Sequence, residues 1–195
     1  MNDEQRIFLT RLKDATATQH KKLESTRLSV NLMKHGVSLE NYADYLVHMR
    51  NVIAWCEHNI FPTTTPLFKD IARRRKLPLI EADLAILRAA SVTGSMPRKT
   101  YHAKADDSLP AALGHMYVIV GSTLGGRMIL NHLEAALGLD AENGAAFFAG
   151  YQADTGTLWK DFLKIFSRYA VENNCEDEVI AGAENAFAGI ENYFA

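Results

Sequence analysis

The stretch Gly121-Ser122-Thr123-Leu124-Gly125-Gly126 places three glycines inside an apolar segment, about Leu113 to Leu137, whose residue spacing otherwise predicts a helix. Each glycine costs on the order of 1 kcal/mol against alanine in a helix interior, so three of them together cost roughly 3 kcal/mol. Because glycine has no Cβ, these positions let a helix bend and bring its backbone close to a flat, bulky neighbour. The stretch therefore predicts close approach to a ligand or to another helix.

Helical periodicity extends over nearly the whole chain, with no convincing strand alternation, so the sequence predicts an all-α fold. We expect one domain over residues 1–195, because no linker, repeat or low-complexity tract divides it. Besides the glycine-containing helix, helices are expected from about residue 4 into the mid-twenties and over residues 28–34, 39–60, 66–76, 79–90, 145–149, 157–172 and 177–194. Residues 91–108 break the pattern and predict a long loop.

Composition excludes several classes of protein. The formal net charge is only −2, with 21 basic and 23 acidic residues, so charge does not indicate a nucleic-acid partner. No apolar run reaches the about 18 residues of a membrane span, and Met1 to Arg11 do not resemble a signal peptide. We expect a cytoplasmic protein without a membrane anchor. Cys56 and Cys175 are expected to be reduced, since two distant thiols make no disulfide framework.

His20 and Glu24 are the second informative feature. They are four residues apart in the first predicted helix, so the carboxylate lies one turn along the same face. Glu24 could accept the Nδ1 proton of the imidazole and leave Nε2 free to bind a metal. An ordinary surface pair has the same spacing, and the pair by itself favours that interpretation. His115, about two turns before the glycines, is a second candidate for a metal contact.

The two features together resemble the heme oxygenase family. Leu12 to Glu24 resembles its proximal helix with the ligating histidine, and Tyr117 to Ile129 resembles its distal helix in the form common among bacterial members. The resemblance covers nearly the whole chain. It implies a multi-helix bundle in which heme is sandwiched between the proximal helix and a glycine-kinked distal helix.

The resemblance also implies roles for individual residues. His20 would bind the heme iron with Glu24 behind it, and the three glycines would bring the distal backbone over the porphyrin. Three lysines match positions where the family binds the heme propionates, namely Lys13, Lys160 and Lys164.

Ser122 departs from the family pattern. Animal members carry there an aspartate that anchors distal water and delivers protons. A serine hydroxyl can orient water but not act as an anion, so altered proton delivery is implied, with Thr123 as a neighbouring candidate. Both hydroxyls could instead bond back to a helix carbonyl.

The implied reaction is oxidative opening of heme b, which is cofactor and substrate, to biliverdin, with release of iron and carbon monoxide. The reaction requires O2 and electrons. The electrons must come from outside, because the chain has no G-x-G-x-x-G motif for a nucleotide cofactor and no cysteine cluster. A ferredoxin or an NAD(P)H-dependent reductase is the expected donor, with Arg73 to Lys76 as a docking candidate. A bilin-accepting photoreceptor is a candidate recipient of the product.

Two alternatives stay open. Ser122 in place of an acid favours a non-catalytic protein that carries heme or a bilin on the same fold. The glycines could also serve only tight helix packing in an interaction domain. A di-iron centre is disfavoured because no Glu-x-x-His is present.

Overall fold

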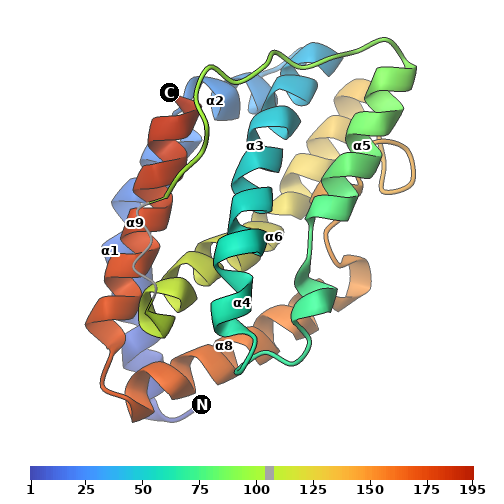
Figure 1. The fold of residues 1–195 in the computed structure, drawn as a ribbon. Coiled ribbons are helices and arrows are strands. Elements are labelled where there is room, and N and C mark those ends of the chain that lie inside the picture. The colour runs from blue at the N-terminus through green and yellow to red at the C-terminus, as the bar shows by residue number, and fades with distance from the viewer. Residues whose placement is uncertain (104–107) are drawn as a thin grey trace.

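The structure, a computed structural model, describes residues 1–103 and 108–195, which form a helical bundle (Figure 1). Over these residues the only β pairing is an isolated bridge between Asp140 and Gly144. None of the helices described is long and apolar enough to cross a membrane. In chain order the α-helices are α1 (Asp3–Glu24), α2 (Arg27–Met33), α3 (Leu39–Asn59), α4 (Phe61–Thr64), α5 (Leu77–Ala89), α6 (Leu109–Leu137), α7 (Ala146–Ala149), α8 (Thr155–Glu172) and α9 (Glu176–Phe194), and two 3-10 helices are η1 (Ile71–Arg74) and η2 (Gln152–Asp154).

Local side chains explain where several helices begin and end. Asn2 and Ser38 each form a capping box with the residue three positions on, so both α1 and α3 begin with their first amides satisfied. Gly36 and Gly138 adopt φ values of +74° and +68°, a left-handed conformation that favours glycine just beyond a helix end. These boundaries follow from sequence-local chemistry, and the sequence predicted them within a few residues.

Helices α1 and α6 are both packed on α8 and α9 (Figure 1). Phe166 of α8 connects them, because its ring centroid lies 5.5 Å from that of Phe8 in α1 and 5.7 Å from that of Tyr117 in α6. Among the described residues, α1 and α6 do not pack extensively on each other. α1 and α6 are therefore two separate helices that both pack on α8 and α9.

The first half of α6 crosses α9 at very close range. A Cβ at Gly114 would lie 2.2 Å from the carbonyl oxygen of Val179, and one at Gly182 would lie 2.4 Å from that of Ala111. No side chain fits at either position without displacing backbone. The closest helix–helix approach in α6 therefore uses a glycine outside the stretch 121–126.

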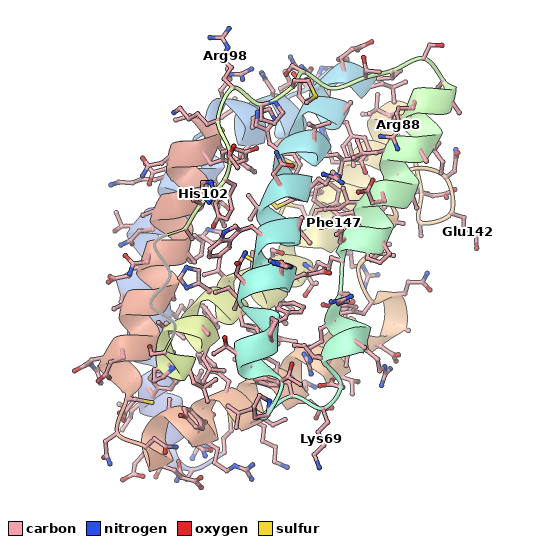
Figure 2. All side chains as sticks on the ribbon, viewed as in Figure 1. Lys69, Arg88, Arg98, His102, Glu142 and Phe147 are labelled. Atoms are coloured by element: carbon pink, nitrogen blue, oxygen red, sulfur yellow. The ribbon has the colours of Figure 1, made fainter. Side chains whose placement is uncertain are left out.

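A buried carboxylate holds the short helix α7 in place. Asp83 of α5 accepts hydrogen bonds from the amides of Ala146 and Phe147, each at 2.8 Å, and from the hydroxyl of Tyr42 in α3 at 3.3 Å. Burial raises the pKa of Asp83 in spite of these bonds. Figure 2 shows Phe147 between α3 and α5, where these contacts place it.

The helix expected over residues 66–76 is wrong. This segment forms turns and the 3-10 helix η1, because tertiary contacts override its helical pattern. The guanidinium of Arg74 is buried over the rings of Phe68 and Phe162 and is paired with Asp70 at 2.8 Å. α3 ends at Asn59, before Pro62, which lies in the first turn of the short helix α4.

The predicted loop is confirmed over residues 91–103, whereas 104–107 lie outside the described residues. In Figure 1 this segment crosses over α3 and descends beside α9. A Cβ at Gly94 would lie 2.5 Å from the carbonyl oxygen of Ala43, so the segment lies directly on α3. Tyr101 is buried, with its ring edge-on to Trp55 of α3 and Tyr193 of α9. The loop is thus a packed part of the bundle.

Candidate functional site

His20 and Glu24 lie on the outer surface of α1. The imidazole Nδ1 is 3.5 Å from Oε1 of Glu24, and the two side chains are 58% and 66% exposed. The His20 ring also meets Phe187 of α9 edge-on, with ring centroids 5.6 Å apart. The carboxylate therefore lies on the Nδ1 side, as predicted, at a distance slightly longer than a strong hydrogen bond.

The second half of α6 presents an apolar surface that no other part of the described chain covers. Leu124 and Met128 are 50% and 68% exposed, although both are large hydrophobic residues. A Cβ at Gly125 would meet no atom within 4 Å. Together with the exposed Ser122, these residues form one side of the helix, which we call the open face of α6.

The three glycines of the quoted stretch have different surroundings. Gly125 faces open space, while a Cβ at Gly121 would lie 3.4 Å from the indole ring of Trp159 in α8. A Cβ at Gly126 would lie 2.6 Å from the carbonyl oxygen of Phe148, so Gly126 is needed for the packing of α6 on α7. Packing thus accounts for Gly126 and leaves Gly125 without a partner in the described chain.

The two hydroxyl residues also separate. Thr123 is buried, and its Oγ1 donates to the carbonyl oxygen of Val120 at 2.6 Å, so it does not reach the open face. Ser122 donates to the carbonyl oxygen of Ile119 at 2.8 Å. The back-bond that the sequence allowed is thus present for both residues. Ser122 alone remains exposed, at the edge of the open face.

The oxygen of Ser122 has a partner that the sequence did not reveal. Lys76, at the start of α5, is 2% exposed, and its Nζ donates to Ser122 Oγ at 2.8 Å and to the carbonyl oxygen of Ile119 at 3.1 Å. The ammonium also lies 5.5 Å from the centre of the Phe147 ring. Burial lowers the pKa of Lys76 to about 7, an effect that the nearby Glu57 carboxylate opposes.

Glu57 of α3 fixes the backbone around Lys76. It is 5% exposed, and its Oε1 accepts from the amides of Lys76 and Leu77 at 2.6 Å and 2.9 Å. Its Oε2 lies 3.7 Å from Nε of Arg75. Glu57 therefore caps α5 from a neighbouring helix, and no local sequence pattern indicates a cap 19 residues away.

The basic run Arg73 to Lys76 is not the solvated patch that a docking surface requires. Arg74 and Lys76 are 1% and 2% exposed, since each is used inside the bundle. Only Arg73 and Arg75 are exposed. Of the docking candidate Arg73 to Lys76, only Arg73 and Arg75 are therefore placed to meet an electron donor.

The lysines predicted to bind propionates are all exposed. Lys13 lies on α1, and Lys160 and Lys164 lie one turn apart on α8. The ring of Trp159, adjacent to Lys160, lies 3.4 Å from where a Cβ at Gly121 of α6 would stand. Within residues 1–103 and 108–195, none of the three lysines forms an ion pair or a side-chain hydrogen bond, so their ammonium groups are available to an anionic ligand.

His115 lies inside the bundle rather than beside the open face. It is fully buried, its Nδ1 is 3.1 Å from the carbonyl oxygen of Ala111, and its ring packs on Trp55. Burial lowers its pKa. His20 is therefore the better placed of the two candidate metal ligands.

The chain belongs to the heme oxygenase family, whose model matches residues 6–195. It is 30% identical over 190 residues to the heme oxygenase PigA of Pseudomonas aeruginosa. The matched region covers 94% of this chain and 89% of PigA.

Solved structures share the fold. The NO- and CO-bound heme oxygenase of Neisseria meningitidis matches with a TM-score of 0.75 and 23% identity, covering 96% of this chain and 89% of that one. The heme oxygenase of Leptospira interrogans matches with a TM-score of 0.76 and 19% identity, covering 96% and 98%. Heme oxygenase-1 of the cyanobacterium Synechocystis, solved in complex with heme, matches with a TM-score of 0.70 and 17% identity, covering 96% and 90%.

Proposed function

We propose that this protein is a biliverdin-producing heme oxygenase that binds heme b between α1 and the open face of α6. The observation that carries the proposal is the uncovered apolar surface around Gly125 on α6. This helix packs on α8 and α9, and so does α1, which carries His20. Leu124 and Met128 are exposed one turn apart beside the bare backbone of Gly125, and such an adjoining apolar surface is typical of a binding site. A flat, apolar macrocycle fits this surface, and the exposed imidazole fits its iron.

On the α1 side, His20 would bind the iron through Nε2. Glu24 lies 3.5 Å from Nδ1, where its carboxylate would accept the proton of that nitrogen and leave Nε2 free. A neutral imidazole donates less electron density than a thiolate. The imidazole–carboxylate pair thus suits a ligand of moderate strength.

On the α6 side, Gly125 would let the helix backbone lie directly against the macrocycle, while Leu124 and Met128 would exclude water from its face. Gly121 would contribute by letting the Trp159 ring approach the helix beside this surface. Gly126 contributes indirectly, because it lets α7 support the helix from behind. Lys13, Lys160 and Lys164 would bind the propionates as exposed cations.

When bound, heme supplies the iron at which O2 is activated and the ring that is opened to biliverdin, iron and carbon monoxide. Electrons would come from an external ferredoxin or NAD(P)H-dependent reductase in the cytoplasm. Arg73 and Arg75 are the members of the basic run that remain exposed for such a contact.

A hemin titration followed by ascorbate under air tests the proposal. We expect a Soret band typical of histidine ligation that decays into the broad red absorption of biliverdin. His20→Ala should abolish the decay, whereas His102→Ala, which alters an exposed histidine on another surface, should not. Failure of the wild-type protein to bind hemin would refute the proposal.

The second candidate function is a carrier of heme or a bilin. Ser122 favours it, because a serine hydroxyl is not an acid that could deliver protons. A Soret band that survives both reductant and oxygen would establish the carrier and exclude the enzyme.

A further inference from the structure

We propose that Lys76 is the proton donor of the open face of α6 and that it acts through the hydroxyl of Ser122. This inference rests on the proposed function and assigns the proton source that Ser122 alone lacks. Lys76 Nζ lies 2.8 Å from Ser122 Oγ, and Ser122 is the polar side chain at the edge of the exposed apolar surface.

The geometry provides a continuous path from a buried cation to the site. Lys76 is 2% exposed and reaches Ser122 Oγ from inside the bundle, while the residue Ser122 is itself exposed to solvent. A hydroxyl can accept one proton and donate its own, so Ser122 can connect the two sides. The charged group acting on the ammonium is Glu57 of α3, whereas α6 presents Ser122 Oγ and the Ile119 carbonyl, and α7 presents the Phe147 ring. Arg75 lies near Lys76 in sequence, but its guanidinium is directed to Glu57 Oε2.

The proton balance is simple. The ammonium of Lys76 gives one proton to Ser122 Oγ, and Ser122 gives its own hydroxyl proton to a water on the open face, leaving a neutral amine. Before this transfer the hydroxyl hydrogen turns away from the Ile119 carbonyl, to which it donates at rest. Solvent returns a proton by the same route. A lysine whose pKa is about 7 can both give and regain a proton near neutral pH, which an exposed lysine cannot.

An anchoring role for Lys76 is the competing explanation, because its ammonium also ties α5 to α6. Anchoring requires only a cation that donates hydrogen bonds, and arginine supplies one. Proton donation requires a group that titrates near neutral pH, and arginine does not titrate there. Lys76→Arg therefore separates the two roles, and Lys76→Met removes both.

The first test uses the heme-free protein and does not depend on activity. Lysine side chains labelled with ¹³C at Cε are followed by NMR from pH 5 to 11. We expect one resonance to titrate near pH 7 and to be missing from Lys76→Met but not from Lys69→Met, an exposed control. A Lys76 resonance that titrates above pH 9 would overturn the proposal.

The second test measures hemin decay with ascorbate as a function of pH. We expect Lys76→Met to lower the decay rate about 100-fold with unchanged hemin affinity, and Lys76→Arg to lower it while removing the pH dependence between 6 and 8. Ser122→Ala should slow decay similarly, and the double variant should be no slower than either single one.

Two outcomes of this second test are distinguishable failures. If wild type does not degrade bound hemin, the proposed function fails and the proton donor fails with it. If wild type degrades hemin and both Lys76 variants keep its rate and pH profile, the enzyme stands and Lys76 is an anchor.

Discussion

Gly114 and Gly125 stand eleven residues apart in the same helix, and their surroundings are opposite. A Cβ at Gly114 would lie 2.2 Å from the backbone of α9, whereas a Cβ at Gly125 would have no atom within 4 Å. The first half of α6 loses side chains in order to pack. In the second half, Gly126 also packs, on Phe148 of α7, but Gly125 lacks a side chain without any packing in return, and this loss points to a ligand that the chain itself does not provide. The difference teaches that a glycine in a helix is informative only together with what its missing Cβ would meet.

The largest expected effect on stability comes from adding a side chain at Gly114, where α6 crosses α9. Gly114→Ala should lower the free energy of unfolding by about 3 kcal/mol, because the atoms in its way are backbone and cannot turn aside. Urea denaturation measures it, with Gly182→Ala as a second variant at the same crossing. A loss below about 0.5 kcal/mol would mean that α6 and α9 cross less closely than the structure indicates.

The next effect concerns Lys76 of α5, whose ammonium bonds α6 at Ile119 and Ser122, where the two halves of α6 meet. Burial lowers its pKa to about 7, against about 10.5 in the unfolded chain, so between these values the unfolded state binds more protons and the stability of wild type rises with pH. Below pH 7 the full cost of the buried charge remains. Lys76→Met should therefore be more stable than wild type by about 2 kcal/mol at pH 6, and the advantage should shrink toward pH 10.

Urea denaturation at several pH values measures this effect. Lys69→Met is the control, because its exposed ammonium should leave the pH dependence unchanged. A Lys76→Met protein that is less stable than wild type at pH 6 would show that the hydrogen bonds of the ammonium outweigh its burial.

Gly125→Ala is expected to separate stability from ligand binding. It should raise the free energy of unfolding by up to about 1 kcal/mol, because alanine is the better helix former and the new methyl group meets nothing. Hemin affinity should fall about tenfold, since the methyl group would stand between backbone and macrocycle. Thermal unfolding and a Soret titration on one preparation decide this, and unchanged affinity would place the macrocycle elsewhere.

Met128→Ser should have the smallest effect on folding. The side chain is 68% exposed, so the free energy of unfolding should change by less than about 0.5 kcal/mol. Hemin affinity should fall about fivefold, roughly 1 kcal/mol, because an apolar contact is lost. Met96→Ser, at an 84% exposed methionine on the segment over α3, is the matched control and should bind hemin like wild type.

Much of the fold could be predicted because its information is local. Asn2, Ser38 and Gly36 mark helix ends by bonds or dihedral angles that involve only their near neighbours. The pairing of His20 with Glu24 is local in the same sense, since a helix fixes the spacing.

The missed features all depend on distant partners. Lys76 appears in the sequence as the last residue of a basic run, and only the packing of α3, α6 and α7 around it makes it buried. Gly126 is indistinguishable from Gly125 until Phe148 comes to lie behind it. The helix expected over 66–76 does not form for the same reason. The side chains that gave its helical pattern make tertiary contacts instead, as Arg74 does over Phe68.

The buried carboxylate of Asp83 supports the second half of α6 from a distance. It ties α7 to α5 and α3, and α7 in turn meets α6 at Gly126 without spare room. The second half of α6 is thus supported by α7, which α5 and α3 hold in place. If a macrocycle binds as proposed, we therefore expect the adjustment to fall on α1, whose later part carries the exposed His20 and packs on α9. On the proposed function, we expect the helix that would bind the iron to adjust on binding, and the helix that would lie over the macrocycle to stay in place.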